Sequence, residues 1–441
     1  MNKGKRTVNK TQLIIHRGTN EIGGSALELS EGGTRVLFDF GIPLEAMERE
    51  NFSPEDYKPA IEGLYRNEAP QFDAIFLTHA HPDHYGLLGL ANPKIPIYVN
   101  RVTHDVLTKI IPLLPKSDAR GLNLHVMDGE LNVGGFSVKA HEIDHSICGA
   151  CAYEVRCGSK TLVYTGDIRF HGRGAWKSSV FATSVRNPDY LVMEGTTLGR
   201  SGQKTVTEDD LIPEFVKVFK GNNLPLVQFS PQNLDRFITV YKACLKTKRT
   251  LVIDPYACAV LEVYGQLSKR IPQYDWNNIG VYFAPNGITR KLAGTQELYK
   301  YKSKKITIDD IANNPQKYVV KGNLHVNKKL LATVPKERLA IVHAMWKGYL
   351  EKPGYLDGYK DVTTCIHASG HASVEDLQAF VKRVNPKHVI PIHTEHKKKY
   401  ADVFKVNAIT LGDGEVFTLV SRDGQSRDRQ VINGRRRCRN G

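Results

Sequence analysis

The sequence of 441 residues has no apolar run long enough to cross a membrane. Its first residues, Met-Asn-Lys-Gly-Lys-Arg, are basic. They lack the apolar core and small-residue cleavage site of a secretory signal peptide. These absences argue against membrane and secreted proteins, so we expect a cytoplasmic protein with no membrane partner.

Cysteine is scarce and unpatterned. The seven cysteines are an odd number and follow no framework spacing, which fits a reducing compartment better than a disulfide scaffold. Cys148 and Cys151 form a single CxxC, but no second pair follows at zinc-ribbon spacing, so we interpret both as packing residues. We also find no internal repeats.

What the sequence does have is length and positive charge. It is 41% hydrophobic and 24% charged, as globular proteins are, and at this length two domains are expected. The net charge of +15 suggests a polyanionic partner. Residues 290–352 hold fourteen Lys or Arg against five Asp or Glu, a net +9. We predict that this segment faces a cleft between the domains. Charge that serves only solubility is the alternative.

Residues 78–84, Thr-His-Ala-His-Pro-Asp-His, place four metal-ligand side chains within six positions. They follow a short apolar run typical of a buried strand, so they lie on the loop at its C-terminal end. In an extended chain His79 and His81 point to the same side. A turn at the intervening proline lets Asp83 and His84 face a second point nearby. Imidazole and carboxylate ligands suit zinc or manganese, so the stretch predicts two neighbouring ions. An inert polar turn is the alternative.

Polar residues also follow several other apolar strands. In layered α/β folds such strand ends form the site. The residues in these positions are Asp39, His145, Asp167, Glu194, His371 and His393. Asp39 precedes Gly41 closely and is a suitable carboxylate to support a site from behind.

Together these residues make a full set for a dinuclear hydrolase. The expected ligands are His79, His81 and His145 for one ion, Asp83, His84 and His393 for the second, and Asp167 as a bridge. Zinc lowers the pKa of bound water to about 7, so a metal-held hydroxide is the expected nucleophile. His371, oriented by Glu194, is the candidate donor of a proton to the leaving oxygen.

The character of the chain changes near Gly202. Patterns of strand, helix, strand and helix at 225–230, 233–246, 250–254 and 257–268 make a βαβ unit. This unit indicates a second α/β domain with a parallel sheet. The last residues, from Gly424 onward, are Arg-rich and polar and are expected to be disordered.

The combined motifs resemble the metallo-β-lactamase fold hydrolases, and among them the β-CASP nucleases, most closely the bacterial and archaeal ribonuclease J family. The residues that carry the resemblance are Asp39, His79 to His84, His145 in Asp-His-Ser-Ile, Asp167 in Thr-Gly-Asp, Glu194, His371 in Ser-Gly-His-Ala, and His393. The resemblance implies an α/β protein, a metallo-β-lactamase αββα sandwich with an inserted β-CASP α/β domain. The implied boundaries are 10–200 and 361–423 for the metallo-β-lactamase domain, 201–360 for the β-CASP domain, and 424–441 for a basic tail.

The resemblance further implies single-stranded RNA as the partner. Ser369 and His371 match an element that contacts RNA phosphates, and a histidine at position 393 is typical of members that cut RNA. The candidate catalytic residues are Asp83, Glu194 and His371. The expected function is a metal-dependent ribonuclease, a 5′-exonuclease with endonuclease activity as a second mode, using two zinc ions or alternatively manganese. The sequence lacks the family's usual C-terminal domain, which contributes dimer contacts, so a homo-oligomer is left open.

Three other functions compete with this one: a small-molecule thioesterase or lactonase of the same fold, a DNA nuclease, and a catalytically idle RNA-binding scaffold. The strongly basic segment is unnecessary for a small substrate, and a scaffold has no need of all seven ligands. Trp346, beside Lys347, could stack on a base, but we interpret it as a core residue. We interpret His367, which has no obvious partner, as a structural or surface residue.

Overall fold

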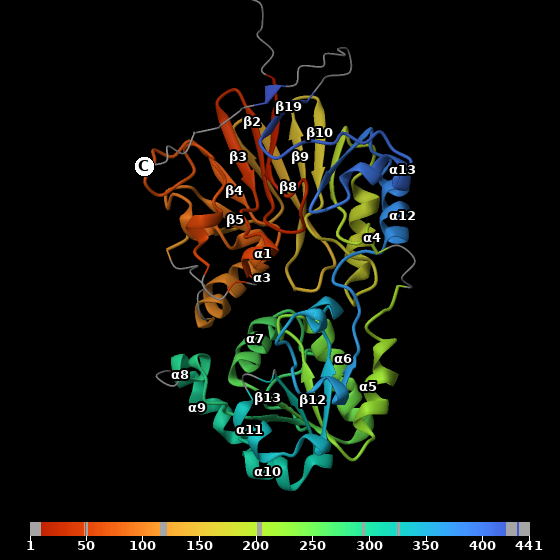
Figure 1. Ribbon diagram of the computed structural model, residues 1–441. Helices are drawn as coiled ribbons and strands as arrows, with labels where there is room; N and C mark the ends of the chain where they lie inside the picture. The colour runs from red at the N-terminus through yellow and green to blue at the C-terminus, as the bar shows by residue number, and fades with distance from the viewer. Residues whose placement is uncertain are drawn as a thin grey trace, which may run out of the picture.

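The computed structural model describes residues 10–47, 49, 52–114, 121–200, 205–292, 296–322, 324, 327–419 and 430–431. The chain forms two lobes (Figure 1), the upper one from both ends of the sequence and the lower one from its middle. Apart from 430–431, the predicted tail at 424–441 lies outside the described residues. Within the described part, no helix has the length and apolarity to cross a membrane.

The upper lobe contains two sheets that pack face to face. The first has the order β20-β19-β1-β2-β3-β4-β5-β6. Its strands are β1 (Gln12–Arg17), β2 (Ala26–Glu31), β3 (Thr34–Phe38), β4 (Ala74–Phe76), β5 (Ile97–Val99), β6 (Leu124–Val126), β19 (Glu415–Thr418) and β20 (Gln430–Val431). The strands β1, β2 and β3 form an antiparallel meander.

The second sheet has the order β18-β11-β10-β9-β8-β7. Its strands are β7 (Glu130–Val133), β8 (Phe136–Glu142), β9 (Cys151–Cys157), β10 (Lys160–Tyr164), β11 (Tyr190–Glu194) and β18 (His388–Ile392). Alternate residues of both sheets, such as Phe38, Phe76 and Tyr153, form one buried core between them. The strand β18 pairs with β11 in parallel and so brings the C-terminal part of the chain back into this lobe.

Helices cover the outer faces of both sheets, which completes the αββα sandwich. The helices of this lobe are α1 (Leu44–Met47), α2 (Pro82–Tyr85), α3 (Arg101–Asp105), α4 (Ala175–Ser184), α12 (Val374–Val384) and α13 (Tyr400–Phe404). Helices α4, α12 and α13 lie on the second sheet, over a core that includes Phe181 and Phe380. The predicted fold class is therefore confirmed.

The lower lobe is built on a third sheet, which is wholly parallel and has the order β14-β13-β15-β12-β16-β17. Its strands are β12 (Leu224–Gln228), β13 (Thr250–Ile253), β14 (Ile279–Val281), β15 (Tyr318–Lys321), β16 (Leu339–His343) and β17 (Thr363–Cys365). Its helices are α5 (Leu211–Phe219), α6 (Leu234–Thr247), α7 (Pro255–Gly265), α8 (Gly287–Leu292), α9 (Gln296–Tyr301), α10 (Ile308–Asn313) and α11 (Lys328–Thr333). The domain boundary at 360 remains a prediction; β17 lies just beyond it.

Helix α7 joins the two lobes. It is apolar over most of its surface, and nine of its eleven residues are buried. It packs against the π-helical segment η3 (Val106–Ile110) of the upper lobe, and one hydrophobic cluster includes residues of both, such as Leu107 and Val260. A helix that is apolar all round is buried on all sides, so the lobes share part of one core.

Candidate metal centre and substrate cleft

The loop after β4 places the histidine motif at the C-terminal edge of the first sheet. Pro82 opens the short helix α2, with His81 at its N-cap. Because proline fixes φ near the helical value, the chain turns at this point as the sequence predicted. The rings of His79 and His81 lie on one side, with centroids 4.8 Å apart.

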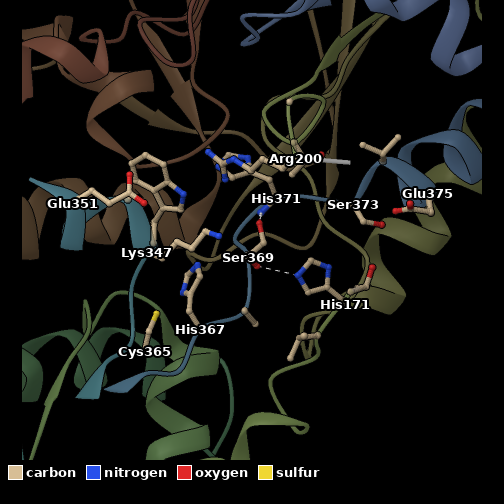
Figure 2. A pocket seen from close by; sticks show the side chains of 18 residues that line it. His171, Arg200, Lys347, Glu351, Cys365, His367, Ser369, His371, Ser373 and Glu375 are labelled. Atoms are coloured by element: carbon tan, nitrogen blue, oxygen red, sulfur yellow. Dashed lines mark hydrogen bonds between the residues drawn. The ribbon is translucent and has the colours of Figure 1, made fainter. Parts of the chain in front are cut away.

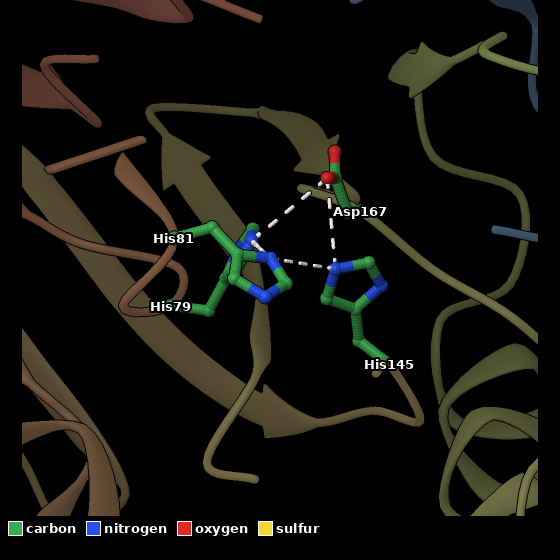
Figure 3. Close-up of side chains that lie close together, drawn as sticks. All are labelled: His79, His81, His145 and Asp167. Atoms are coloured by element: carbon green, nitrogen blue, oxygen red, sulfur yellow. Dashed lines mark hydrogen bonds and ion pairs between the residues drawn. The ribbon is translucent and has the colours of Figure 1, made fainter. Parts of the chain in front are cut away.

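The first cluster comprises His79, His81, His145 and Asp167 (Figure 3). The Nε2 atoms of His79 and His145 lie 3.0 Å and 3.1 Å from the Nδ1 atom of His81. The Oδ2 atom of Asp167 lies 3.8 Å from Nε2 of His79 and 3.7 Å from Nε2 of His145. Three ring nitrogens and one carboxylate oxygen therefore converge from three separate loops.

The second cluster comprises Asp83, His84, Asp167 and His393. The Nε2 atom of His84 lies 3.3 Å from Oδ2 of Asp167, and the Nε2 atom of His393 lies 3.7 Å from Oδ2 of Asp83. Within each cluster the ligand atoms lie within 4.8 Å of one another. Since Asp167 belongs to both clusters, its carboxylate is placed where a bridging ligand between two ions would be.

The unpaired atoms of the clusters test whether metal ions fit there. The buried Nε2 atoms of His84 and His393, and Oδ1 of Asp167, have no hydrogen-bond partner among the described residues. A buried polar atom left without a partner costs about 1–3 kcal/mol. Imidazole nitrogen and carboxylate oxygen are ligands that zinc accepts in tetrahedral sites. The two clusters therefore fit a binuclear metal site.

Burial and charge set the protonation of these histidines. Burial, together with the neighbouring histidines, holds the pKa of His79 and His145 well below the usual range and lowers that of His81 to about 4. Burial would lower the pKa of His84 as well, but Asp167 and Asp39 raise it well above its usual value. The first cluster thus presents neutral rings, the form that binds metal.

Asp39 supports the site from behind, as the sequence suggested. This fully buried residue has a φ of +59°, a left-handed conformation that a non-glycine residue adopts at some cost. Its carboxylate accepts hydrogen bonds from the Thr78 backbone N–H (2.7 Å), the His84 ring (Nδ1, 2.8 Å) and the Tyr164 hydroxyl (2.7 Å). The bond to Nδ1 of His84 leaves Nε2 for a metal, the usual arrangement behind a histidine ligand.

Glu194 and His371 form a pair next to the clusters. Glu194, at the end of β11, is buried, and its two oxygens lie 3.1 Å and 3.0 Å from Nδ1 of His371. The same nitrogen lies 3.8 Å from Oδ2 of Asp167. Burial alone would lower the pKa of His371, but Glu194 and Asp167 raise it to about 9.

Two adjoining cavities of about 810 and 800 Å³ form a cleft between the lobes. They share a set of lining residues at the centre of the cleft: Gly199, Arg200, Trp346, His367, Ser369 and His371. Figure 2 shows Ser369 and His371 facing this space, with Oγ of Ser369 accepting from the His371 backbone N–H at 3.0 Å. The second cavity also contains His81, Asp83 and His393, so both metal clusters open onto the cleft.

Three interpretations from the sequence need correction. Trp346 is not a core residue, because 42% of its surface is exposed and it lines the cleft, 5.1 Å from the Arg200 guanidinium. His367 also lines the cleft. Of the basic segment 290–352, Lys347 lines the cleft, whereas Lys302, Lys304, Lys305, Lys328 and Lys329 do not. Helices α10 and α11 lie at the far end of the lower lobe (Figure 1).

Sequence reasoning missed a buried link between the lobes. Arg169 lies 3.2 Å from Asp144 and donates to Asp235 at 2.6 Å. Asp144 directly precedes His145, while Asp235 lies in the first turn of α6 in the lower lobe. The only sequence signal was an arginine two residues after Asp167, which no local pattern distinguishes from a surface residue.

Comparison with known families agrees with this geometry. Residues 34–207 match the family described as the beta-lactamase superfamily domain. Residues 360–410 match the Zn-dependent metallo-hydrolase RNA specificity domain. The first match ends after Glu194, and the second contains Ser369, His371 and His393. The chain is therefore a metallo-hydrolase by family.

Individual relatives are distant. Ribonuclease J of Mycoplasma pneumoniae is 22% identical over 93% of this chain and 74% of its own length. Ribonuclease J of Pyrococcus abyssi is 21% identical over 95% of this chain and 97% of its own length. Integrator complex subunit 11 of Danio rerio is 22% identical over 91% of this chain and 73% of its own length.

The crystal structure of a protein of unknown function from Enterococcus faecalis V583 has the same fold, with a TM-score of 0.74 and 22% identity over 93% of this chain and all of that one. The two matched families, the fold and the paired ligand clusters agree. The chain thus belongs to the metallo-β-lactamase/β-CASP family and is a distant relative of ribonuclease J and Integrator complex subunit 11.

Proposed function

We propose that the protein is a ribonuclease that hydrolyses phosphodiester bonds in single-stranded RNA, acting from the 5′ end and, as a second mode, internally. One observation carries the proposal: the His371–Glu194 pair adjoins two ligand clusters that share Asp167, in a cleft formed by both lobes. The match to an RNA specificity domain and the name ribonuclease J of several relatives support RNA as the substrate.

The proposed ligands are His79, His81 and His145 for one zinc ion, Asp83, His84 and His393 for the other, and Asp167 for both, with manganese as the alternative metal. When bound, such ions lower the pKa of water at the site and counter the charge on phosphoryl oxygens. Asp39 contributes by orienting the His84 ring.

His371 is the proposed proton donor. Its Nδ1 atom is held by Glu194, so Nε2 is the nitrogen left to serve a substrate in the cleft. With a pKa raised to about 9, the ring carries a proton at neutral pH. It can therefore protonate the leaving ribose oxygen while Glu194 keeps the ring in place.

Ser369 is the proposed phosphate contact beside His371. Its Oγ atom accepts a hydrogen bond from the His371 backbone N–H, which leaves the hydroxyl proton for a phosphate oxygen. Its backbone carbonyl accepts from Nε2 of the buried His171 at 2.9 Å, which fixes the loop (Figure 2).

The test is a comparison of substrates on the purified protein with added zinc or manganese. Labelled RNA with a 5′-monophosphate, the same RNA with a 5′-hydroxyl, single-stranded DNA of that sequence and a generic ester are incubated separately. We expect RNA to be cut and the ester to be inert. The His371→Ala variant is the matched control for contaminating nuclease. Faster cleavage of DNA than RNA, or hydrolysis of the ester alone, would overturn the proposal.

A further inference from the structure

A separate cavity of about 280 Å³ lies at the carboxyl edge of the inserted sheet. Its polar lining comes from the ends of three strands, with Gln228 at the end of β12, Asp254 just after β13 and Lys321 at the end of β15. Residues of α8, among them Thr289, close one side. The cavity belongs to neither metal cluster.

The cavity sits where the sheet reverses its winding direction. From β12 the chain passes through α6 to β13 on one side, and from the adjacent strand β15 it passes through α11 to β16 on the other side. Consistent with this, α6 and α11 contribute to different hydrophobic clusters. In open parallel sheets such a switch point leaves a crevice at the carboxyl ends of the strands, and ligands bind there.

The walls of this cavity suit a flat heteroaromatic ring. Phe229 and Tyr256 are aromatic, and Ile288 and Met345 are aliphatic. Lys321, which is 7% exposed, pairs with Asp254 at 2.9 Å, so the two charges cancel and do not select an anion. The volume lies at the lower end of the range for ligand pockets, which favours one small ring system over a larger molecule.

The polar groups mainly offer donors. The Gln228 amide oxygen accepts from the Tyr355 hydroxyl at 3.2 Å, and the Asn286 amide oxygen accepts from the Thr289 backbone N–H at 2.8 Å. Each amide therefore has its N–H groups to offer a ligand. The buried Thr289 hydroxyl has no hydrogen-bond partner among the described residues. Such donors match carbonyl oxygens, which guanine and uracil present where adenine and cytosine present amino groups.

The cavity adjoins the substrate cleft, since Phe229, Ser230 and Met345 line both. Proteins recognise the bases of single-stranded RNA in pockets of this kind. The base is unstacked from its neighbours, stacks on aromatic side chains and forms hydrogen bonds through its edge. We propose that this cavity binds one keto nucleobase, guanine or uracil, from the strand held in the cleft. The inference rests on the proposed ribonuclease function for the source of that base.

The test measures binding in EDTA, where no hydrolysis occurs, of ten-residue uridine, cytidine and adenosine strands to the full chain. We expect the uridine strand to bind about tenfold more tightly than the cytidine strand. Ile288→Trp, which fills the cavity, should abolish that difference and leave the cytidine affinity unchanged. Ile308→Trp, at a half-buried isoleucine of α10 outside the cavity, is the matched control and should retain the preference.

A second variant removes only a hydroxyl. Thr289→Val keeps the shape and breaks no hydrogen bond in the described structure, so the fold should be preserved. We expect it to weaken uridine binding several-fold, and Thr289→Ser to restore it. Equal binding of uridine and cytidine strands by the unmodified protein would overturn the inference, as would an Ile288→Trp variant that behaves like Ile308→Trp.

Mononucleotides identify the source of the base. UMP that competes with the uridine strand indicates a base of the bound strand, whereas UMP that binds without competing indicates a free nucleotide and overturns the strand assignment. If the protein binds UMP in preference to CMP but neither binds nor cuts RNA, the ribonuclease proposal and the strand assignment both fail, and only the preference of the cavity for a keto base stands. If it cuts RNA with no base preference and binds no UMP, the pocket alone fails.

Discussion

The two metal clusters differ in where their ligands come from. His79, His81 and His145 of the first cluster all precede residue 150, on loops of the two sheets packed against each other. The second cluster joins Asp83 and His84 to His393, which follows β18 and arrives only when that strand pairs with β11. The first cluster can therefore form from one continuous part of the chain, whereas the second needs both ends of it.

The two clusters also differ in the protonation of their histidine rings. The rings of the first cluster are neutral because they are buried, and the pKa of His81 falls to about 4. In the second cluster Asp167 and Asp39 raise the pKa of His84, which then holds a proton that a metal must displace. We therefore expect the first cluster to be ready for metal once the chain folds, and the second to bind metal in competition with a proton on His84.

Removing the shared Asp167 carboxylate should impair metal binding in both clusters alike. Asp167→Ala takes a ligand from both, so we expect both ions to be lost and turnover to fall more than about a thousandfold. Elemental analysis after metal-replete purification, with circular dichroism as the control for folding, checks this. A variant that keeps two ions would show that Asp167 does not bridge them.

Removing a ligand from one cluster should distinguish the two clusters, because only the ion of that cluster should be lost. His393→Ala should reduce the metal content from two ions to one, with loss of most activity, because the first cluster contains no residue from the C-terminal part. Asp83→Ala should behave in the same way. The matched variant is His145→Ala, for which we expect the remaining ion to sit in the second cluster. Complete metal loss in His393→Ala would mean that neither cluster binds alone.

Removing the proton donor should leave both clusters intact. His371→Ala should retain two ions and still lower turnover about a hundredfold or more, the usual contribution of general acid catalysis. A nitrophenyl phosphodiester, whose leaving group needs no proton, should recover part of the rate. Glu194→Gln should show a weaker form of the same behaviour. If His371→Ala instead strips metal, the histidine is a ligand and the mechanism is wrong.

As the pH falls, metal binding should weaken in the second cluster before it weakens in the first. His84 has a raised pKa, so protons compete for it already near neutral pH, whereas His81 takes up a proton only near pH 4. Between pH 8 and pH 6 each unit should weaken the second ion by up to about tenfold, one proton being displaced per ion. The first ion should change little over that range. Metal titrations at several pH values, read as two separate binding steps, check this.

The membership of the two clusters could be predicted from the sequence because its signal is local. Residues 78–84 carry ligand spacing within one loop, Glu194 ends an apolar strand, and Asp39 and Asp167 follow one closely. The αββα fold followed from resemblance. By contrast, the exposure of Trp346 and the position of the basic helices depend on which side of a helix or loop meets the other lobe, which periodicity does not encode.

Capping patterns were informative, but they did not fix every boundary. Thr207 is of a residue type that favours a helix N-cap and is followed by acidic residues, yet α5 begins at Leu211. Thr207 and Asp210 exchange hydrogen bonds in a turn ahead of the helix, so the capping pattern is real and one turn early. The contact of Arg169 with Asp144 and Asp235 could not be predicted from the sequence, because the two aspartates come together only in the folded chain.

Helix α7 has a consequence for how the molecule can be taken apart. Its burial against η3 makes the inserted domain part of a single cooperative unit, so heating should give one transition and not two. Excised alone, the insert would expose the side of this helix that η3 covers and should aggregate. If the protein acts on RNA as proposed, the lobes should not swing apart when a strand enters the cleft, because that movement would break the hydrophobic contact between α7 and η3.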